Sequence, residues 1–330
     1  MYGTVAAMEA MNKSALVIGG QGALGRAVIA ELTAHGWTAH PAGRRRDERP
    51  RFRHLDLDRP ETVAAALANT EVVISTVADR ELTVEQWVLR HGGVLVNCSH
   101  SPGRSAAELR AEARSAGSVL LNAGLVPGLA NLIAADLLRR HPEADCLEVA
   151  FTVLLRGTAG KAGAKFALDG LTARSRHRTL KLPLPEPFGE LPFIAVGEGD
   201  DGGFSGVAGG RRVERYLGFA DRAPRLGLRA VNALCLMRLL PRKAFALPAT
   251  TNEVTAEPTS VWIGVRRGSE RLANSVVSCD GDYRTTAAAA RVFAELLSTE
   301  RRPGCFNPED LFSFGQLAPK LEEIGVRVGS

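Results

Sequence analysis

The sequence predicts an α/β fold in which a doubly wound parallel sheet is joined to a second, mixed sheet. Three observations predict it. A short apolar run at 15–18 ends at a glycine, and a stretch with helical periodicity follows it. This alternation of apolar run and amphipathic stretch recurs up to about residue 121. From Leu147 to about Asp282 the pattern changes to β-rich runs such as "LEVAFTVLLR" and "SVWIGVRR".

The first apolar run, Ala15 to Ile18, is typical of a strand buried on both faces. From Ala23 to His35 apolar residues recur at spacings of three and four, which predicts a helix. Between the two lies Gly20-x-Gly22-x-x-Gly25. In this position the first glycine permits a sharp turn, the second lets a pyrophosphate approach the backbone, and the third lets helix and strand pack closely. The segment therefore predicts a Rossmann-type dinucleotide site with the phosphates at the helix N-terminus.

Three arginines follow the second predicted strand, Trp37 to Ala42. This strand is expected to end beside the adenosine ribose, where an NAD enzyme usually places Asp or Glu. The chain has Gly43 and then Arg44, Arg45 and Arg46. A guanidinium donates two parallel hydrogen bonds to a 2′-phosphate, whereas a carboxylate repels it. The arginines therefore predict NADP(H) as the cofactor, the alternative being a solvated arginine run.

The rest of the first half continues the alternation of strand and helix, and six strands are expected in the parallel sheet. Ligands bind at the carboxyl ends of such strands, which directs attention to the loops at 75–78, 97–102 and 122–128. In the last loop Pro127 and Gly128 precede a helix, and the amides of 128–130 are expected to be free. The residues predicted to bind the cofactor are Gly20, Gln21, Gly22, Ala23, Leu24, Gly25, Arg44, Arg45, Ser75, Thr76, Val77, Asn97, Asn122, Gly124 and Pro127.

Three residues are candidates for catalysis. His100 lies in the loop after the fifth strand, and its unperturbed pKa near neutrality suits an acid or base, although a loop hydrogen bond is the plainer role. Cys98 is a candidate nucleophile only if its thiolate is stabilised. Lys161 lies in "RGTAGKAGAKFALDGL", a loop expected to bring positive charge to the substrate. A solvated lysine is the alternative there.

Taken together, these motifs resemble the saccharopine dehydrogenase family. The resemblance rests on the glycine motif, "AGRR", "VVISTV", "AGLVPGLANLIAADLL" and the closing segment from "GDYRTTAAAARVFAELL" to "KLEEIGVRV". It covers about residues 14–138 and 282–328. Members commonly have tyrosine, valine and aspartate where this chain has Val96, Asn97 and Cys98, which argues against saccharopine itself as the substrate.

The resemblance implies an NADP-binding domain and, inserted before the chain returns to it, a substrate and dimerisation domain. The expected boundaries are 13–124 plus 284–330 for the first, 125–283 for the second, and a flexible N-terminus at 1–12. A homodimer is expected. The amphipathic stretch 224–248 is open to three interpretations: an apolar substrate pocket, a dimer or core helix, or a membrane-surface helix.

Composition narrows the function classes. The formal net charge is +5, but 36 acidic residues are interspersed with 41 basic ones, and no aromatic pattern accompanies the arginines, so nucleic-acid binding is not expected. Five scattered cysteines and seven unclustered histidines indicate neither a disulfide framework nor a metal site. The sequence shows no signal peptide and no membrane span, which favours a cytoplasmic protein.

The sequence therefore predicts an NADP(H)-dependent oxidoreductase with a small-molecule substrate. Hydride transfer to an iminium needs little acid or base from the protein, which favours reduction of a C=N bond in an amino-acid-derived substrate. Two alternatives remain open. One is an enoyl (C=C) reductase that acts on an apolar acyl substrate, and the other is a non-catalytic NADP-binding regulator.

Overall fold

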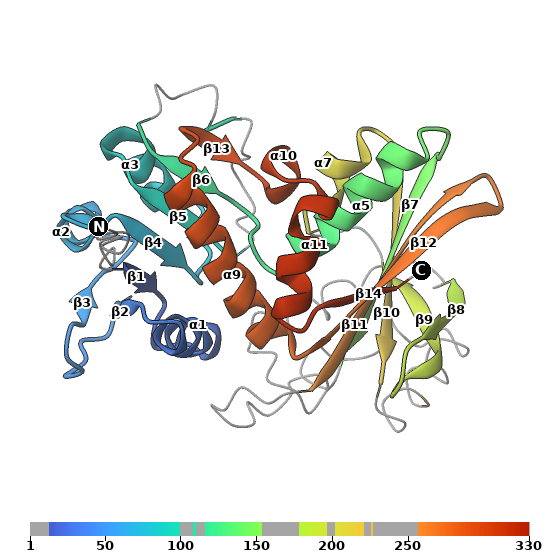
Figure 1. The fold of residues 1–330 in the computed structure, drawn as a ribbon, viewed down its shortest axis with the longest axis horizontal. Coiled ribbons are helices and arrows are strands. Elements are labelled where there is room, and N and C mark those ends of the chain that lie inside the picture. The colour runs from blue at the N-terminus through green and yellow to red at the C-terminus, as the bar shows by residue number, and fades with distance from the viewer. Residues whose placement is uncertain are drawn as a thin grey trace, which may run out of the picture.

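The computed structural model describes residues 13–99, 108–109, 116–153, 178–196, 202–220, 226 and 257–329. They form two seven-stranded sheets, with helices on both faces of the first sheet and between the two sheets (Figure 1). The predicted fold class, a parallel sheet followed by a mixed one, is confirmed. The N-terminal segment 1–12 and the amphipathic stretch 224–248, apart from residue 226, lie outside the described residues.

The first sheet consists of β1 (Ser14–Ile18), β2 (Thr38–Gly43), β3 (Arg53–His54), β4 (Val72–Ser75), β5 (Val94–Asn97), β6 (Ser118–Leu120) and β13 (Gly304–Phe306). Its strands lie in the order β13-β6-β5-β4-β1-β2-β3, and every neighbouring pair is parallel. The order 3-2-1-4-5-6 within it is that of a Rossmann-type sheet. The six predicted strands are present, and β13 from the closing segment adds a seventh.

Helices cover both faces of this sheet: α1 (Ala23–Ala34) and α9 (Asp282–Thr299) on one, and α2 (Pro60–Leu67) and α3 (Thr83–His91) on the other. In β1, Ala15 and Val17 join the core beneath α1 and α9. Leu16 and Ile18 join the core beneath α2 and α3. All four are at most 1% exposed, which explains why the run is apolar without alternation.

The second sheet consists of β7 (Cys146–Val153), β8 (Thr179–Leu184), β9 (Gly189–Val196), β10 (Arg212–Phe219), β11 (Pro258–Arg267), β12 (Glu270–Asp280) and β14 (Arg327–Gly329). Its order is β14-β12-β11-β7-β10-β9-β8. Only β7 and β10 are parallel, so the sheet is mixed. Strand β14 pairs with β12, although the sequence prediction gave the segment up to residue 330 to the first domain.

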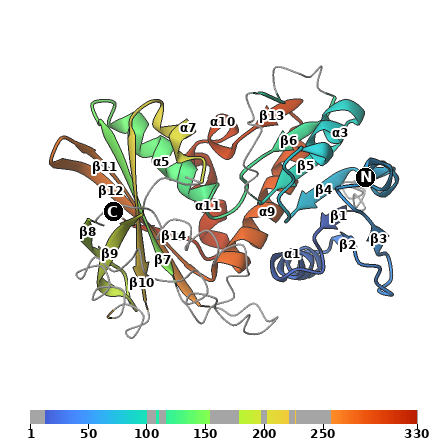
Figure 2. The same cartoon turned by 180° about the vertical axis from the view of Figure 1, so that it is seen from behind.

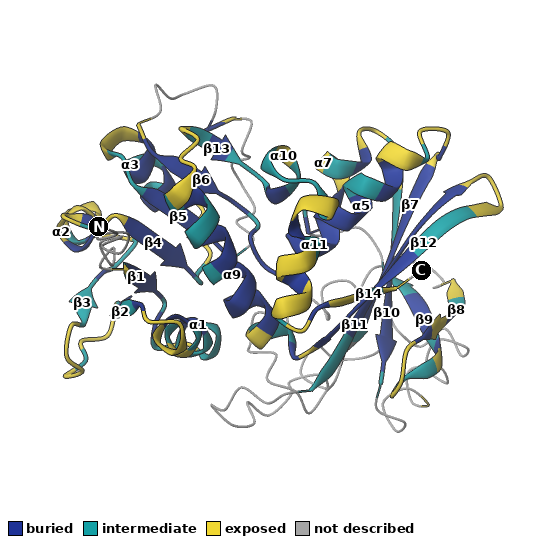
Figure 3. Cartoon of the chain, viewed as in Figure 1, coloured by how far each residue is buried: buried dark blue, intermediate teal, exposed yellow. Residues whose placement is uncertain are grey.

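The remaining described helices are α5 (Leu129–Arg140), α7 (Phe204–Ala208), α10 (Pro308–Leu311) and α11 (Phe314–Glu323). Leu129, Ile133 and Leu137 of α5 pack in one apolar core with Leu147 and Val149 of β7. Figure 2 shows α5 and α11 between the second sheet and α9. Figure 3 shows that the strands of both sheets are largely buried, whereas α11 has an exposed side. The two sheets therefore share a continuous apolar core through these helices.

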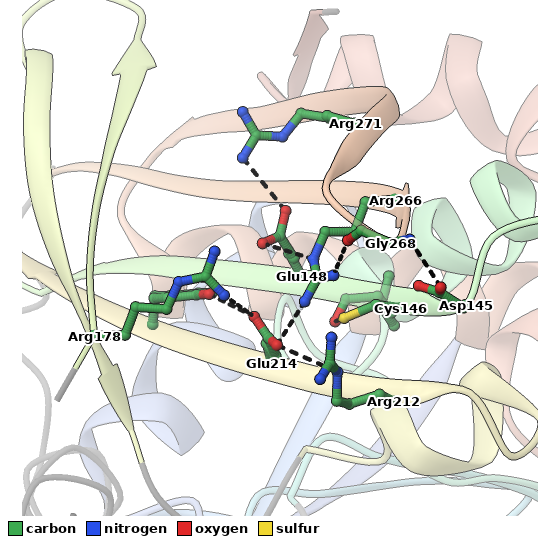
Figure 4. Close-up of polar contacts among 11 residues, drawn as sticks. Asp145, Cys146, Glu148, Arg178, Arg212, Glu214, Arg266, Gly268 and Arg271 are labelled. Carbon is green, nitrogen blue, oxygen red and sulfur yellow. Dashed lines mark hydrogen bonds and ion pairs between the residues drawn. The ribbon is translucent and has the colours of Figure 1, made fainter. Parts of the chain in front are cut away.

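Four arginines at one end of the second sheet form ion pairs with two glutamates (Figure 4). We call them the second-sheet arginines: Arg178, Arg212, Arg266 and Arg271. In the centre, Arg266 Nε lies 3.3 Å from Glu148 Oε1, and its Nη2 lies 2.6 Å from Glu214 Oε1. Arg271 reaches the other oxygen of Glu148 at 3.3 Å. The side chains of Arg266 and Glu148 are only 8% and 1% exposed, so this pair is shielded from water.

Glu214 lies at the outer part of the same network. Its carboxylate accepts a 2.7 Å hydrogen bond from the hydroxyl of Tyr216 and also pairs with Arg178 and Arg212 at 3.2 and 3.3 Å. Burial alone would raise the pKa of Glu214. The Tyr216 hydroxyl and the surrounding guanidinium groups outweigh burial and lower that pKa below its usual value. The network thus joins β7, β10, β11, β12 and the residue just before β8 through charged groups that all have partners.

Candidate functional site

The glycine turn between β1 and α1 brings backbone segments into close contact. A Cβ atom added at Gly25 would lie 2.1 Å from the carbonyl oxygen of Gly19, so only glycine permits this approach. One added at Gly20 would lie 2.9 Å from Pro41 Cβ. Gly19 itself has a φ of +79°, and a Cβ there would meet Thr76 Oγ1 at 2.5 Å. The packing of β1, β2 and α1 therefore requires glycine at these positions.

The first turn of α1 has no side-chain cap. Gly22 precedes the helix in an extended conformation, no side chain accepts from the helix start, and the first turn has no acidic residue. The amides of Ala23, Leu24 and Gly25 begin the helix, where backbone donors have no carbonyl partner one turn earlier. These donors and the partial positive charge of the helix end attract an anion. The turn therefore has the geometry of a phosphate site.

The arginine loop begins where β2 ends, at Gly43. The side chains of Arg44, Arg45 and Arg46 are exposed. They make no hydrogen bond or ion pair with any residue that the structure describes. Three guanidinium groups therefore stand beside the glycine turn with their charge uncompensated by neighbouring carboxylates.

Gln21 connects the glycine turn to this loop. Its Nε2 donates 3.0 Å hydrogen bonds to the Arg45 carbonyl and to Asp47 Oδ2. Arg49 also holds Asp47, with Nη2 2.6 Å and Nε 2.8 Å from Oδ2. Hydrogen bonds from Arg49 first and Gln21 second hold the pKa of Asp47 well below its usual range. The charge of this carboxylate is thus compensated by Arg49, unlike the charges of the three preceding arginines.

The loop after β4 lies against the glycine turn. Thr76 donates from its amide and from Oγ1 to the Ile18 carbonyl, at 3.0 and 2.9 Å. A Cβ atom at Gly19 would lie 2.6 Å from Val77 Cγ1, which shows how close the two loops are. Ser75 is 2% exposed, and its hydroxyl donates to the Val77 carbonyl at 3.3 Å. The structure thus brings the predicted residues Thr76 and Val77 to the turn and places Ser75 beneath them.

Asn97, at the end of β5, is fully buried, and both ends of its side-chain amide are engaged. Its Nδ2 donates to Glu85 Oε1 at 2.5 Å. Its Oδ1 accepts from the amide and the hydroxyl of Ser99 at 2.8 and 2.7 Å. The sequence prediction placed Asn97 against the cofactor. Its side-chain hydrogen bonds are made inside the protein, so the prediction that it contacts the cofactor stays a prediction.

Cys98, predicted as a weak candidate nucleophile, is 7% exposed. Burial raises the pKa of its thiol to about 12, because a thiolate is poorly solvated there. This environment argues against a reactive Cys98. His100 and Lys161, the other two catalytic candidates, lie outside the described residues.

The turn after β6 differs from its prediction. Asn122 has a φ of +55° and donates to Asn307 Oδ1 at 3.0 Å. Gly124 donates its amide to the Pro127 carbonyl at 2.9 Å. The amides of residues 128, 129 and 130 donate at 2.9 to 3.0 Å to Asn131 Oδ1 and to the carbonyls of residues 124 and 125. The prediction that these three amides are free was therefore wrong, because the turn folds back and satisfies them.

Two residues near these loops were not predicted. Glu85 lies on α3, and its spacing of three from Leu82 and four from Leu89 places it on the buried face, a signal present in the sequence. Thr286, in the first turns of α9, accepts a 3.0 Å hydrogen bond from the Leu125 amide. The family resemblance includes the "GDYRTTAAAA" stretch that contains Thr286, but the sequence does not predict its hydrogen bond with the Leu125 amide.

Among the described residues, no group of three or more His, Cys, Asp or Glu side chains is arranged to hold a metal ion. No helix within those residues has the length and apolar character needed to cross a membrane.

Several solved structures resemble the chain. A meso-DAPDH mutant with DAP, from Clostridium tetani, is 12% identical with a TM-score of 0.49, over 93% of this chain and 96% of that chain. A probable aspartate-semialdehyde dehydrogenase from Pseudomonas aeruginosa is 11% identical with a TM-score of 0.42, over 88% and 100%. A short-chain dehydrogenase/reductase superfamily protein from Agrobacterium tumefaciens with bound NAD is 21% identical with a TM-score of 0.20, over 25% and 31%.

No curated protein matches the chain. A family match exists for its first part, which contains the glycine turn, the arginine loop and the strands β1 to β4. Residues 15–95 match the sequence model of the NAD dependent epimerase/dehydratase family.

Proposed function

We propose that this chain is an NADP(H)-dependent oxidoreductase of the saccharopine dehydrogenase type that reduces a C=N bond of an amino-acid-derived substrate. One observation carries the proposal. An uncapped helix N-terminus at the end of a Rossmann-type β1 lies beside the unpaired guanidinium groups of Arg44, Arg45 and Arg46. The match of residues 15–95 to an NAD-dependent family supports the dinucleotide part of the proposal.

The residues present fit this cofactor. The amides of Ala23, Leu24 and Gly25 would hold the pyrophosphate, which approaches most closely at Gly22. Arg44 and Arg45 would hold the 2′-phosphate, because their side chains are exposed and bond to none of the residues that the structure describes. The carboxylate of Asp47 would repel this phosphate less than a free carboxylate does, since Arg49 neutralises it.

We choose a C=N bond because the described loops present no side chain placed as an acid or base for a substrate. In the part of the chain that the structure describes, Asn97 and Ser99 hydrogen-bond within the protein, and Cys98 is buried. None of the three is placed as an acid or base for a substrate. When bound, the cofactor supplies the hydride, and an iminium carbon attracts it without proton transfer from the protein. These loops would then serve to orient the cofactor.

The first experiment is calorimetric titration of the purified protein with NADPH and, separately, with NADH. Binding of NADPH with NADH weaker or absent supports the cofactor assignment. NADPH oxidation is then followed with imine-forming amine and keto-acid pairs and with enoyl thioesters. Turnover on thioesters alone would overturn the C=N proposal in favour of an enoyl reductase. Failure to bind either nucleotide would overturn the oxidoreductase proposal itself.

A non-catalytic NADP-binding regulator is the second candidate, favoured by the same scarcity of acids and bases in the described loops.

We assign substrate binding and dimerisation to the second sheet and its helices, on the family resemblance. Four described cysteines, Cys98, Cys146, Cys279 and Cys305, are free thiols, which supports a reducing, cytoplasmic location. Light scattering tests the homodimer. NADPH binding together with a stoichiometric partner protein and no turnover would favour the regulator.

A further inference from the structure

Glu85 is a carboxyl group enclosed in the protein beside loops that the proposed function gives to the cofactor. It lies near the start of α3 and is 0% exposed. Its Oε1 accepts the 2.5 Å hydrogen bond from Asn97 Nδ2. Its Oε2 is buried without a hydrogen-bond partner. An ionised carboxylate with so few donors is costly in such a place, whereas the neutral acid is tolerated.

Hydrogen bonds lead from Glu85 to two loops at the carboxyl edge of the first sheet. Asn97 at the end of β5 donates a hydrogen bond to Glu85 through Nδ2. Its Oδ1 accepts hydrogen bonds from the amide and the hydroxyl of Ser99 in the following loop. The hydroxyl of Ser99 also lies 2.7 Å from the Val77 carbonyl, in the loop after β4. Val77 in turn lies against Gly19 of the glycine turn. The state of Glu85 is thus linked through three residues to the backbone around the proposed cofactor site.

Few charged groups surround Glu85. Asp79, in the loop before α3, accepts from the Thr83 amide at 2.7 Å. Burial first, and to a smaller extent the negative charge of Asp79, raise the pKa of Glu85 to about 7, although hydrogen bonds from its own backbone and from Asn97 act in the opposite direction. Strands β5 and β6, which pack on α3, carry no titratable side chain. Among the other described residues packed there, α2 contributes Glu61, and Glu108 lies beside the buried Leu109; both glutamates are exposed.

We propose that Glu85 is a positioning residue that acts through Asn97 and Ser99 to hold Val77 after β4 and residues 98–99 after β5 where they receive the nicotinamide half of NADP(H). The inference rests on the proposed function. In its neutral form Glu85 offers Asn97 an acceptor oxygen and places no charge in the core. When it ionises, the buried charge demands further donors or water, and the short link to Asn97 changes. The loops then lose the arrangement that binds the cofactor.

The test compares NADPH dissociation constants from about pH 6 to pH 9 for the wild type, Glu85→Gln and Glu81→Gln. Glutamine keeps the acceptor oxygen but does not ionise. Glu81 is exposed in the same segment, so its variant is a matched control for the change in charge. We expect wild-type binding to weaken by up to about tenfold per pH unit above pH 7. Glu85→Gln should bind NADPH with little dependence on pH in this range, and Glu81→Gln should follow the wild type.

A second pair of variants separates positioning from folding. Glu85→Ala removes the acceptor, and we expect weaker NADPH binding at every pH with kcat lowered as well. Ser99→Ala removes the hydroxyl contact to Val77 but keeps the backbone bond to Asn97, so its loss should be smaller. If Glu85→Ala does not fold, the comparison of Glu85→Gln with the wild type still decides the question.

The outcomes distinguish this inference from the proposed function. NADPH binding by the wild type with the same pH profile as Glu85→Gln would overturn the role of Glu85 and leave the proposed function intact. A wild type that binds neither NADPH nor NADH at any pH would overturn both. Because the ionisation of the nucleotide phosphate is common to all variants, only the difference between their profiles is interpreted.

Discussion

The two groups of arginines in this molecule differ in what surrounds them. Arg44, Arg45 and Arg46 follow β2 at one side of the molecule (Figure 1), and their exposed side chains have no hydrogen-bond or ion-pair partner among the described residues. The second-sheet arginines lie at the other side, by the β11–β12 hairpin, and each has a nitrogen within 3.3 Å of a glutamate oxygen. The residue type is the same in the two groups, but only in the second does every guanidinium have a carboxylate partner among the described residues.

This difference indicates two uses of the same side chain. A guanidinium that is paired with a buried carboxylate contributes to the fold, because removal of either partner leaves an unpaired charge. A guanidinium without a partner contributes little to the fold, and its field remains available to an external anion. Variants of the paired second-sheet arginines should therefore change stability, and variants of Arg44, Arg45 and Arg46 should change ligand binding.

The largest effect is expected for Arg266→Ala. The variant leaves Glu148, which is 1% exposed, with only the partly exposed Arg271, and the free energy of unfolding should fall by about 3 to 5 kcal/mol. Urea unfolding measures this, and NADPH binding should stay the same in the folded fraction. Arg212→Ala is the control, because that side chain is 62% exposed and the expected loss is below about 1 kcal/mol. Equal losses for the two variants would contradict the importance of burial.

The double variant Arg44→Ala with Arg45→Ala tests the unpaired group. Charged hydrogen bonds to a phosphate contribute enough that NADPH binding should weaken by about 2 to 4 kcal/mol. NADH binding and the urea midpoint should change little, because neither side chain has a partner in the part of the chain that the structure describes. Calorimetry with both nucleotides checks this. Equal weakening for NADPH and NADH would mean that the arginines act on the pyrophosphate or the fold instead.

Glu85 differs from both groups of arginines, because it is a buried carboxyl group with no arginine among its described partners. Its pKa is raised to about 7, so the folded protein keeps a proton that the unfolded chain releases above its ordinary value near 4.5. Stability should therefore fall as pH rises from about 4.5 to 7 and level off above, at a cost of up to about 3 kcal/mol. Glu85→Gln should be more stable than the wild type by this amount above pH 7, with the difference vanishing below pH 4.5. A constant difference between the two at all pH values would show that Glu85 does not titrate.

Local patterns predicted the first sheet well. The apolar run of β1 and the helical spacing of α1 are short-range signals, and the observed bounds differ from the predicted ones by at most a residue. Strand β9 was not predicted, because Pro192 interrupts its apolar run. The fold tolerates this proline because β10 pairs only with residues 194–196 of β9.

The features of the candidate site that short-range patterns encode were predicted, and those that depend on distant parts of the chain were not. Glycine spacing and the arginines after β2 are visible in the sequence, since the motif itself fixes their place. The partners of Asn97 and of the amides at 128–130 depend on how the chain folds back, which no local pattern encodes. Whether an arginine is paired is likewise decided by strands far apart in sequence, as Arg266 and Glu148 show.

The smallest effect is expected for Gln21, which connects the glycine turn to the arginine loop. Gln21→Ala removes the hydrogen bonds to the Arg45 carbonyl and to Asp47, so the arginine loop loses its tie to the turn. NADPH binding should weaken by about 1 kcal/mol, the usual net contribution of such bonds. NADH binding should weaken less, because in the proposed complex the loop would face the 2′-phosphate and not the pyrophosphate. Calorimetry again measures both. Gln21→Glu sharpens the test, since its carboxylate would repel Asp47 and should weaken NADPH binding more than alanine does.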